Sequence, residues 1–447
     1  MRLARHTWST LPTLGKRVLQ HPVSQNAASL LLIHAVNYIL PLVTIPYLAR
    51  VLLPSGWGEV LFAQSFAVWL TVIVEYGFLF SATRDVARQA NSPKELEIIV
   101  NSVNGAKILL VLVATLLATT AWIVLPQFQQ APLFLLLSWL AAVFQGLYPL
   151  WYFQGVLRMR RLAILSTFTR TIATGLTFLL VRNSTDGWIV LALQAAAIVA
   201  ATLISLGWLY QEIPMRRPQL EQVRKSLNEG KYMFTVSLAA AIYGLAGSFF
   251  VGLFTNPVQV GFYGGAERIH RIMTNLFAIA GQALYPYMSQ LVQGNPVRSI
   301  KVVRILFVLS CGAGLVLALL TMVAAPQLVQ VILGSGFEPA SLILQIMSLQ
   351  LILTGVSRVL GIQWMLPLGM DRQFNYLIVG GGLFNLLLIA LLVPAWQSVG
   401  MAVAFVLTET LITGGMIWML QRSNYAFWRR DNRLLQPIAI TLWDNNE

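Results

Sequence analysis

The sequence predicts an all-α polytopic membrane protein with about twelve transmembrane helices, arranged as two six-helix halves. Three observations lead to this fold class. The composition is strongly apolar, long apolar runs recur along the whole chain, and basic residues gather in alternate connections between those runs.

Composition sets the class of protein. Of the 447 residues, 57% are apolar and 10% are charged, and the mean hydropathy is +0.71. Soluble domains have about 25% charged residues. A single cysteine, Cys311, excludes an intramolecular disulfide and a thiolate metal cluster. The first apolar run is too long for the core of a signal peptide, so we interpret it as a retained first span.

The apolar runs divide the chain into two lobes. We expect a polar N-terminal segment at 1–25, an N-lobe at 26–210, a linker at 211–231, a C-lobe at 232–420 and a polar tail at 421–447. The predicted spans are 29–52, 58–82, 105–126, 132–153, 162–182 and 188–210 in the N-lobe, then 232–254, 261–290, 302–325, 340–365, 375–394 and 399–420 in the C-lobe. The span at 261–290 is the least hydrophobic of them.

Positive charge alternates between connections. The basic connections contain Arg84, Arg88, Lys94 and Lys107; Arg158, Arg160 and Arg161; Arg216, Arg217, Arg224, Lys225 and Lys231; Arg298 and Lys301; and Arg372. The connections between them contain only Arg50 and Arg182. Lys and Arg accumulate on the cytoplasmic side, so both termini and the linker are predicted to be cytoplasmic. The net charge of +14 then reflects anchoring in the membrane rather than nucleic-acid binding.

A weak internal similarity supports two related halves. The stretch ARVLLPSGWGEV after the first span resembles LFTNPVQVGFYGG after the seventh, with Gly58 and Gly261 at matching places. Two six-helix halves with this relation would be parallel repeats, an architecture that transporters use. The alternative is a coincidence between two Pro/Gly turns.

The first span carries a polar face. His34, Asn37 and Tyr38 follow at i, i+3 and i+4, and Pro41 and Pro46 predict a kink. A broken helix with one polar face is typical of the wall of a polar passage. The alternative is a packed helix whose three polar side chains bond to neighbouring helices.

Arginines lie within several predicted spans, where a charge costs ~2.5–3.5 kcal/mol and usually faces a cavity or a partner. Arg170 shares its helical face with threonines, and no acid lies near it in the sequence. Arg268 and Arg271 start a second polar stripe, although Glu267 could pair with Arg271. Arg358 lies in the tenth span and could instead extend towards the inner face.

Acidic residues are fewer. Glu75 shares a face of the second span with Gln64, and Glu409 lies midway along the twelfth. Either could carry H⁺ or Na⁺ coupling, or merely neutralise an arginine. Enzyme signals are poor: the sequence has no Walker-type phosphate loop, so we expect no ATP site, and its four histidines show no metal-ligand spacing.

Four motifs resemble the bacterial O-antigen and exopolysaccharide flippases (Wzx-type polysaccharide transporters). They are NYILPLVTIPYLARVL with the Gly56-x-Gly58 turn; Glu75-Tyr76-Gly77-Phe78 leading to Arg84 and Asp85; Trp151-Tyr152-Phe153-Gln154-Gly155; and Leu366-Pro367-Leu368-Gly369 with Phe374, Asn385, Pro394, Gly400 and Glu409. They occur in order over nearly the whole chain. The chain departs from the usual pattern at Leu157 and Arg158, where an acid is common, and around Pro54, where a glycine is.

The resemblance implies a non-enzymatic transporter of the bacterial inner membrane. It has two six-helix lobes around a central cavity and moves undecaprenyl-diphosphate-linked oligosaccharide by alternating access. Arg170, Arg268, Arg271 and Arg358 would bind the diphosphate, and His34, Asn37, Tyr38 and Gln64 would line the sugar path. Arg84 and Asp85 would belong to a gate motif. Partners would be the lipid-linked substrate, membrane lipids and the polysaccharide polymerase and chain-length machinery, with no nucleic acid.

Two other classes remain as alternatives. A cation-coupled drug extruder of the same fold would be expected to have an acid in the first or seventh span, and neither span has one. A membrane polymerase or ligase would need a large outward loop, which the predicted spans do not leave.

Overall fold

The computed structural model covers residues 22–244, 247–423 and 425–428, including all side chains in these ranges except those of 22–39, Pro41, Tyr243 and Ala283. Every regular element in these ranges is a helix, as the sequence predicts. The helices form two compact units. Unit 1 contains the described residues up to Val51 and Phe66–Leu238; unit 2 contains Leu52–Ser65 and the described residues from Ala239 onward.

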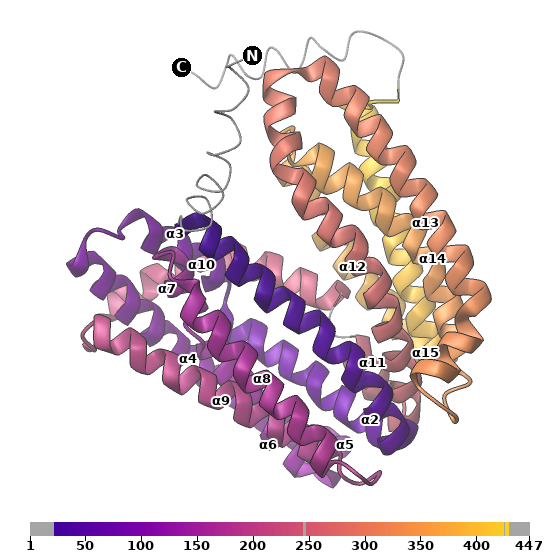
Figure 1. Cartoon of the computed structure of the whole chain (residues 1–447), viewed down its shortest axis with the longest axis horizontal. Helices are drawn as coiled ribbons and strands as arrows, with labels where there is room; N and C mark the ends of the chain where they lie inside the picture. Colours follow the sequence, from indigo (N-terminus) through magenta and orange to yellow (C-terminus); the bar gives the residue numbers. More distant parts are fainter. Residues whose placement is uncertain (1–21, 245–246, 424, 429–447) are drawn as a thin grey trace, which may run out of the picture. The chain divides into compact units, whose positions relative to one another are not determined.

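Unit 1 is a bundle around paired antiparallel helices. Its elements are most of α2 (Pro22–Glu75), then α3 (Phe78–Arg88), α4 (Pro93–Val124), α5 (Pro126–Gln130), α6 (Pro132–Leu147), α7 (Leu150–Gly155), α8 (Met159–Leu180), α9 (Gly187–Glu212) and the first part of α10 (Leu220–Gly244). Helix α9 packs against both α6 and α8, and α3 packs against α7 (Figure 1).

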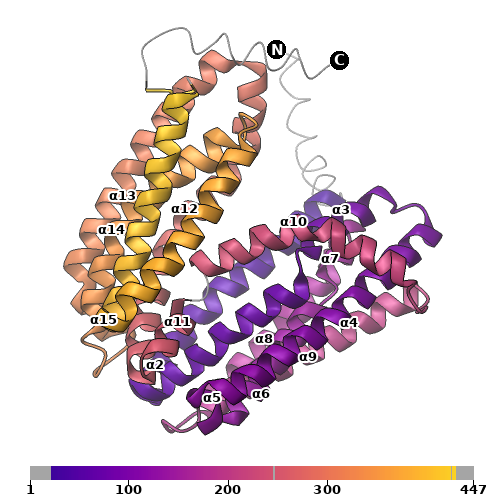
Figure 2. The same cartoon turned by 180° about the vertical axis from the view of Figure 1, so that it is seen from behind.

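Unit 2 is built around α14. Its elements are α11 (Gly247–Phe254), α12 (Pro257–Gly294), α13 (Pro296–Ile332), α14 (Ala340–Arg358), the π-helical turn η1 (Val359–Met365) and α15 (Asp371–Arg422). Helix α14 contacts α12, α13 and α15, which surround it (Figures 1 and 2).

The lengths of these helices suit a bilayer. Eight helical stretches of the described chain are long and apolar enough to cross a membrane, or nine if the bent pair α10–α11 forms one span. Helix α12, the charged span, is not among them. Helices α2 and α15 each contain a break with positive φ, at Leu53 (φ 59°) and Gln397 (φ 52°), where two predicted spans meet. The count of twelve stays a prediction.

The turn at the α2 break packs against the start of α12. A Cβ on Gly58 would overlap the carbonyl oxygen of Pro257, and a Cβ on Gly261 would overlap the carbonyl oxygen of Pro54. The two segments matched in the sequence therefore contact each other reciprocally, each glycine accommodating the proline four residues before the other. Both segments lie in unit 2.

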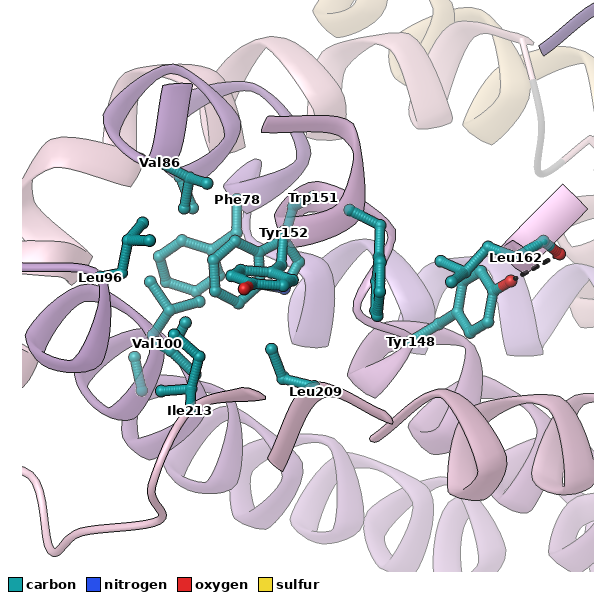
Figure 3. Close-up of a cluster of buried hydrophobic side chains, with 14 of the residues drawn as sticks. Phe78, Val86, Leu96, Val100, Tyr148, Trp151, Tyr152, Leu162, Leu209 and Ile213 are labelled. Carbon is teal, nitrogen blue, oxygen red and sulfur yellow. Dashed lines mark hydrogen bonds between the residues drawn. The ribbon is translucent and has the colours of Figure 1, made fainter. Parts of the chain in front are cut away.

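An aromatic core fixes one end of unit 1. Phe78 on α3 packs with Trp151 and Tyr152 on α7 and with aliphatic residues of α4 and α9 (Figure 3). The chain between α9 and α10 is tied to the same end, because Arg216 pairs with Glu97 at 2.8 Å and its backbone N–H donates to Asn101 Oδ1 at 3.0 Å. The polar connection before α10 is thus anchored to α4.

Candidate functional site

Two arginines of unit 2 lie on α12. The helix begins at Pro257, where Asn256 Oδ1 accepts the Gln259 N–H at 3.1 Å, a standard N-cap. Arg268 lies eleven residues further on, roughly 16 Å along the axis. We call Glu267, Arg268 and Arg271, together with Trp57 and Gln64 of α2, the α12 arginine cluster. The defined start of α12 fixes the position of this cluster along the helix.

Arg268 is held by an amide and an aromatic ring. Its Nη2 donates to Gln64 Oε1 at 2.5 Å, and its guanidinium lies 5.1 Å from the centre of the Trp57 ring. Trp57 is only 1% exposed. Neither partner carries a negative charge, and none of the salt bridges formed within the described residues involves Arg268. Its positive charge is oriented by these contacts without being neutralised by them.

Arg271 has a carboxylate partner. Its Nη2 donates to Glu267 Oε1 at 2.5 Å, and also to the Gly244 carbonyl at 3.4 Å. Ser248 donates to the other oxygen of Glu267 at 3.4 Å. The i, i+4 pairing that the sequence left open is therefore present. With two arginines and one glutamate, the cluster keeps one net positive charge.

Arg170 lies in unit 1, midway along α8. It is half-buried and interacts electrostatically with Tyr148, whose hydroxyl donates to the Leu162 carbonyl at 3.4 Å (Figure 3). Of the threonines on its face, Thr177 donates to its own helix backbone at Ala173 at 2.8 Å. The Thr167 hydroxyl is buried with no hydrogen-bond partner in the described part of the chain.

Lys107 is a buried cation that the sequence analysis assigned wrongly to a connection. Helix α4 begins at Pro93, so Lys107 lies fourteen residues inside it and is 1% exposed. Its Nζ donates to the Gly146 carbonyl at 2.7 Å and lies 5.8 Å from the Trp151 ring centre. Glu75 interacts with it electrostatically. One signal was present: Leu96, Val100, Val103 and Lys107 share one helical face.

Glu409 is an acid buried in unit 2. It is 4% exposed on α15, and the Ser357 hydroxyl on α14 donates to its Oε1 at 2.5 Å. The Asn385 amide donates at 2.9 Å to the hydroxyl of Thr408, the residue before Glu409. A carboxylate with a neutral hydroxyl partner inside an apolar bundle can bind a proton or a cation.

The other predicted site residues are spread over the molecule. Arg358 ends α14 just before η1 and is half-buried. Arg84 and Asp85 form an exposed pair on α3 with 3.2 Å between Nε and Oδ1. His34, Asn37 and Tyr38 have side chains outside the described residues. Among the residues that are described, no group of three His, Cys, Asp or Glu side chains could hold a metal ion.

Unit 1 and unit 2 thus each contain cations on their long helices, buried in the case of Lys107 and half-buried in the case of Arg170, Arg268 and Arg358. Gln64, Arg268 and Arg271 are brought together in unit 2, whereas Arg170 and Glu75 lie in unit 1. Arg358 and Glu409 occupy another part of unit 2, on α14 and α15.

Three named proteins are similar in sequence to this chain. A protein from Escherichia coli (strain K12), provisionally named an O-antigen transporter, is 30% identical over 90% of this chain and 97% of its own. A protein of Shigella dysenteriae with the same name is 26% identical over 87% and 98%. A Haloferax volcanii protein, provisionally named a low-salt glycan biosynthesis flippase, is 26% identical over 58% and 55%. All three are named as transporters or flippases, so the non-enzymatic prediction is confirmed.

Two solved structures share the fold. The lipid II flippase MurJ in an inward closed conformation has a TM-score of 0.61 at 12% identity and covers 88% of this chain and 87% of its own. An inward-facing multidrug resistance MATE transporter has a TM-score of 0.58 at 15% identity, covering 86% and 94%. The family model described as "Polysaccharide biosynthesis protein" matches residues 23–292. The predicted resemblance is confirmed, and the chain belongs to the polysaccharide biosynthesis protein family.

Proposed function

We propose that this protein flips an undecaprenyl-diphosphate-linked oligosaccharide, an O-antigen or exopolysaccharide repeat unit, across the bacterial inner membrane. The observation that carries the proposal is Arg268. Its side chain is held by Gln64 and Trp57, and it takes part in none of the salt bridges formed within the described residues. A guanidinium held in this way suits a diphosphate, which it can bind with two parallel hydrogen bonds.

The named relatives favour this function over drug export. The likeness to MurJ and to a MATE transporter shows the fold alone, and that fold accommodates both activities. The relatives that match in sequence are named for O-antigen transport and for glycan biosynthesis. The cationic balance along the long helices also suits an anionic substrate, since Lys107 is buried and Arg170 and Arg268 are half-buried.

The remaining predicted residues keep proposed roles. Arg170, Arg271 and Arg358 would add to the attraction for the diphosphate, while His34, Asn37 and Tyr38 would contact sugar. Gln64 has two roles in this proposal, because it orients Arg268 and can also donate its amide to a sugar hydroxyl. Transport would proceed by alternating access about the predicted linker at 211–231, whose residues from Leu220 onward form the start of α10, with Arg84–Asp85 as part of a gate.

Replacing Arg268 by glutamine tests the proposal. A charge-assisted hydrogen bond contributes ~1.5–3 kcal/mol, so substrate affinity should fall roughly ten- to a hundredfold. Lysine should restore part of the affinity, because it keeps the charge but loses the planar fork. The measurement is complementation of surface polysaccharide in a flippase-null strain, together with membrane protein levels.

Arg422→Gln is the matched control, because Arg422 also stacks on a tryptophan, Trp418 at 5.3 Å, but lies exposed at the end of α15. It should complement fully. Wild-type polysaccharide from Arg268→Gln at normal protein levels would exclude Arg268 from the substrate site.

The loop charges favour a cytoplasmic location for both termini and for the predicted linker at 211–231. Single cysteines at Asn228 and Ser335, both exposed, in a Cys311→Ser background test this topology. An impermeant thiol reagent added to intact spheroplasts should label position 335 and leave position 228 unlabelled until the membrane is opened. Labelling of position 228 from outside would refute the proposed orientation.

Coupling to H⁺ or Na⁺ is assigned to Glu409, with Glu75 as the second candidate. Glu409→Gln keeps the size of the side chain and an acceptor for Ser357. We expect this variant to accumulate and to bind substrate normally but to lose the dependence of transport on the ion gradient. Glu338→Gln, an exposed acid between α13 and α14, is the control. Unchanged gradient dependence in Glu409→Gln would leave that carboxylate with a purely structural role.

A further inference from the structure

Unit 1 has a polar cavity that the proposed transport site does not use. Its volume is about 840 Å³, and it lies between the outer face of α10 and the side chain of Tyr76 at the end of α2. Its charged lining residues are Glu221, Arg224, Lys225 and Lys231. We call it the α10 pocket (Figure 2 shows α10 next to α3).

The orientation of α10 about its own axis is fixed by the face that packs against the aromatic core of unit 1. Val223 is 4% exposed and packs in the aromatic core of unit 1, and Leu227 packs against the same core. Between them, the Ser226 hydroxyl donates to Ser102 Oγ on α4 at 3.1 Å. Arg224 and Lys231, separated by seven residues, therefore both project from the outer face, together with Lys225.

Tyr76 forms the wall opposite these cations. It has a positive φ of 48°, just before Gly77 at 75°, so the chain turns sharply where α2 ends. The Tyr76 ring stacks on Phe234 of α10 at 4.6 Å between centroids. Gly230 admits the ring, because a Cβ there would lie 3.1 Å from the Tyr76 ring. The pocket is thus bounded on one side by the packed Tyr76 ring, and its cations lie on the exposed face of α10.

The charge of the pocket is positive. Three cations and one acid give it two net positive charges. No salt bridge within the described residues involves Arg224, Lys225 or Lys231, whereas Arg216, just before α10, is paired with Glu97. Gln219, Gln222 and Asn228 add neutral donors around the cations. Clustered cations with amide donors and an aromatic wall match the chemistry of a phosphate group attached to an organic moiety.

The position of the pocket along α10 indicates the source of that phosphate. From Lys231 to Ala239, where apolar residues dominate, the helix rises roughly 12 Å. The pocket therefore lies at the depth of lipid headgroups if the apolar end of α10 enters the hydrocarbon. Basic pockets at the cytoplasmic ends of transmembrane helices bind anionic headgroups.

We propose that the α10 pocket binds the phosphate headgroup of an anionic membrane phospholipid in the cytoplasmic leaflet. This site is separate from the α12 arginine cluster and stands whether or not the transported substrate is a lipid-linked oligosaccharide. A lipid bound there contacts α10 and, through Tyr76, the junction between α2 and α3.

The test compares two triple variants of the full chain in nanodiscs. In the pocket variant, Arg224, Lys225 and Lys231 are changed to Gln; in the control, the exposed Lys94, Arg160 and Arg161 are changed to Gln, which removes the same charge elsewhere in unit 1. Native mass spectrometry measures phosphatidylglycerol retention against phosphatidylcholine. Each cation near an anionic surface contributes about 1 kcal/mol, so the pocket variant should retain phosphatidylglycerol roughly a hundredfold less tightly.

A second measurement leaves the three cations in place. A photoreactive residue at Asn228, which lines the pocket, should crosslink to phosphatidylglycerol in the otherwise unchanged chain, and excess phosphatidylcholine should not compete. Equal retention by the two triple variants, or no preference for phosphatidylglycerol in the unchanged chain, would overturn the proposal. Crosslinking displaced by inorganic pyrophosphate or by a short isoprenyl diphosphate more readily than by phosphatidylglycerol would also overturn it, because it would assign the pocket to a free or isoprenoid phosphate.

Arg268→Gln separates this inference from the proposed function. It should lose transport while retaining the phospholipid, because Arg268 lies in unit 2 and the α10 pocket in unit 1. Loss of phospholipid retention in this variant would contradict the separation of the two sites.

Discussion

Alanine at Gly58 or Gly261 is expected to destabilise unit 2 by ~1–3 kcal/mol each, towards the upper end of that range. In both cases the added methyl group meets a backbone carbonyl, of Pro257 or of Pro54, rather than the end of a flexible side chain. A carbonyl in a helical turn cannot rotate away, so relief requires separation of the two segments. The measurement is the thermal unfolding midpoint of the purified protein, with complementation as a second readout.

Gly175→Ala and Gly207→Ala are the matched controls. Both glycines are helical, and a Cβ at either would meet nothing within 4 Å. Alanine there should be neutral or stabilising by up to about 1 kcal/mol, from helix propensity. The double variant Gly58→Ala/Gly261→Ala should cost less than the two single costs added together, because the first separation already relieves the second overlap. Unfolding midpoints equal to the wild type in both single variants would show that the segments do not pack as described.

The same pair of glycines shows what the sequence could predict. The turns at Gly58 and Gly261 were recognised because proline and glycine have strong local effects on the backbone. That the two turns contact each other is visible only in the structure, although the internal similarity suggested that the two segments are related. The 203-residue offset between the glycines also aligns Gln64 with Glu267, next to Arg268, and Gln64 and Arg268 do bond in the structure. The partner of Arg268 was missed because single-chain patterns report neighbours within a helix, not residues on different helices.

The wrong placement of Lys107 in a connection has a different cause, the predicted start of its helix. Most predicted spans match helices, since apolar runs of about 20 residues are an unambiguous signal. Helix α4 starts about twelve residues before its predicted span because its first turns are polar on one face only. That polar start placed Lys107 in a connection. The charge of a lysine does not predict whether its side chain is buried. The position of Lys107 on the same helical face as Leu96 and Val100 does predict that it is buried.

Lys107→Met is expected to cost ~1–3 kcal/mol of stability, the range for leaving a buried hydrogen-bond acceptor without its partner. Two groups lose an interaction with the lysine ammonium, the Gly146 carbonyl and the Glu75 carboxylate. Helix α6 ends at Leu147, so the Gly146 carbonyl lies in its last turn and accepts a hydrogen bond from Lys107 Nζ at 2.7 Å. Glu75 loses the cation that offsets its charge. The measurement is the unfolding midpoint of the purified protein, with Lys94→Met, an exposed lysine on the same helix, as the control.

Glu75→Gln in the Lys107→Met background separates the two losses. If the uncompensated carboxylate dominates, the double variant should recover most of the lost stability, because two neutral side chains replace the pair. If the uncapped carbonyl dominates, the double variant should stay as unstable as Lys107→Met. Wild-type stability in the single variant would refute both contributions. Recovery of stability without recovery of transport would instead assign the Glu75–Lys107 pair a part in the transport cycle, beyond holding α4 against the end of α6.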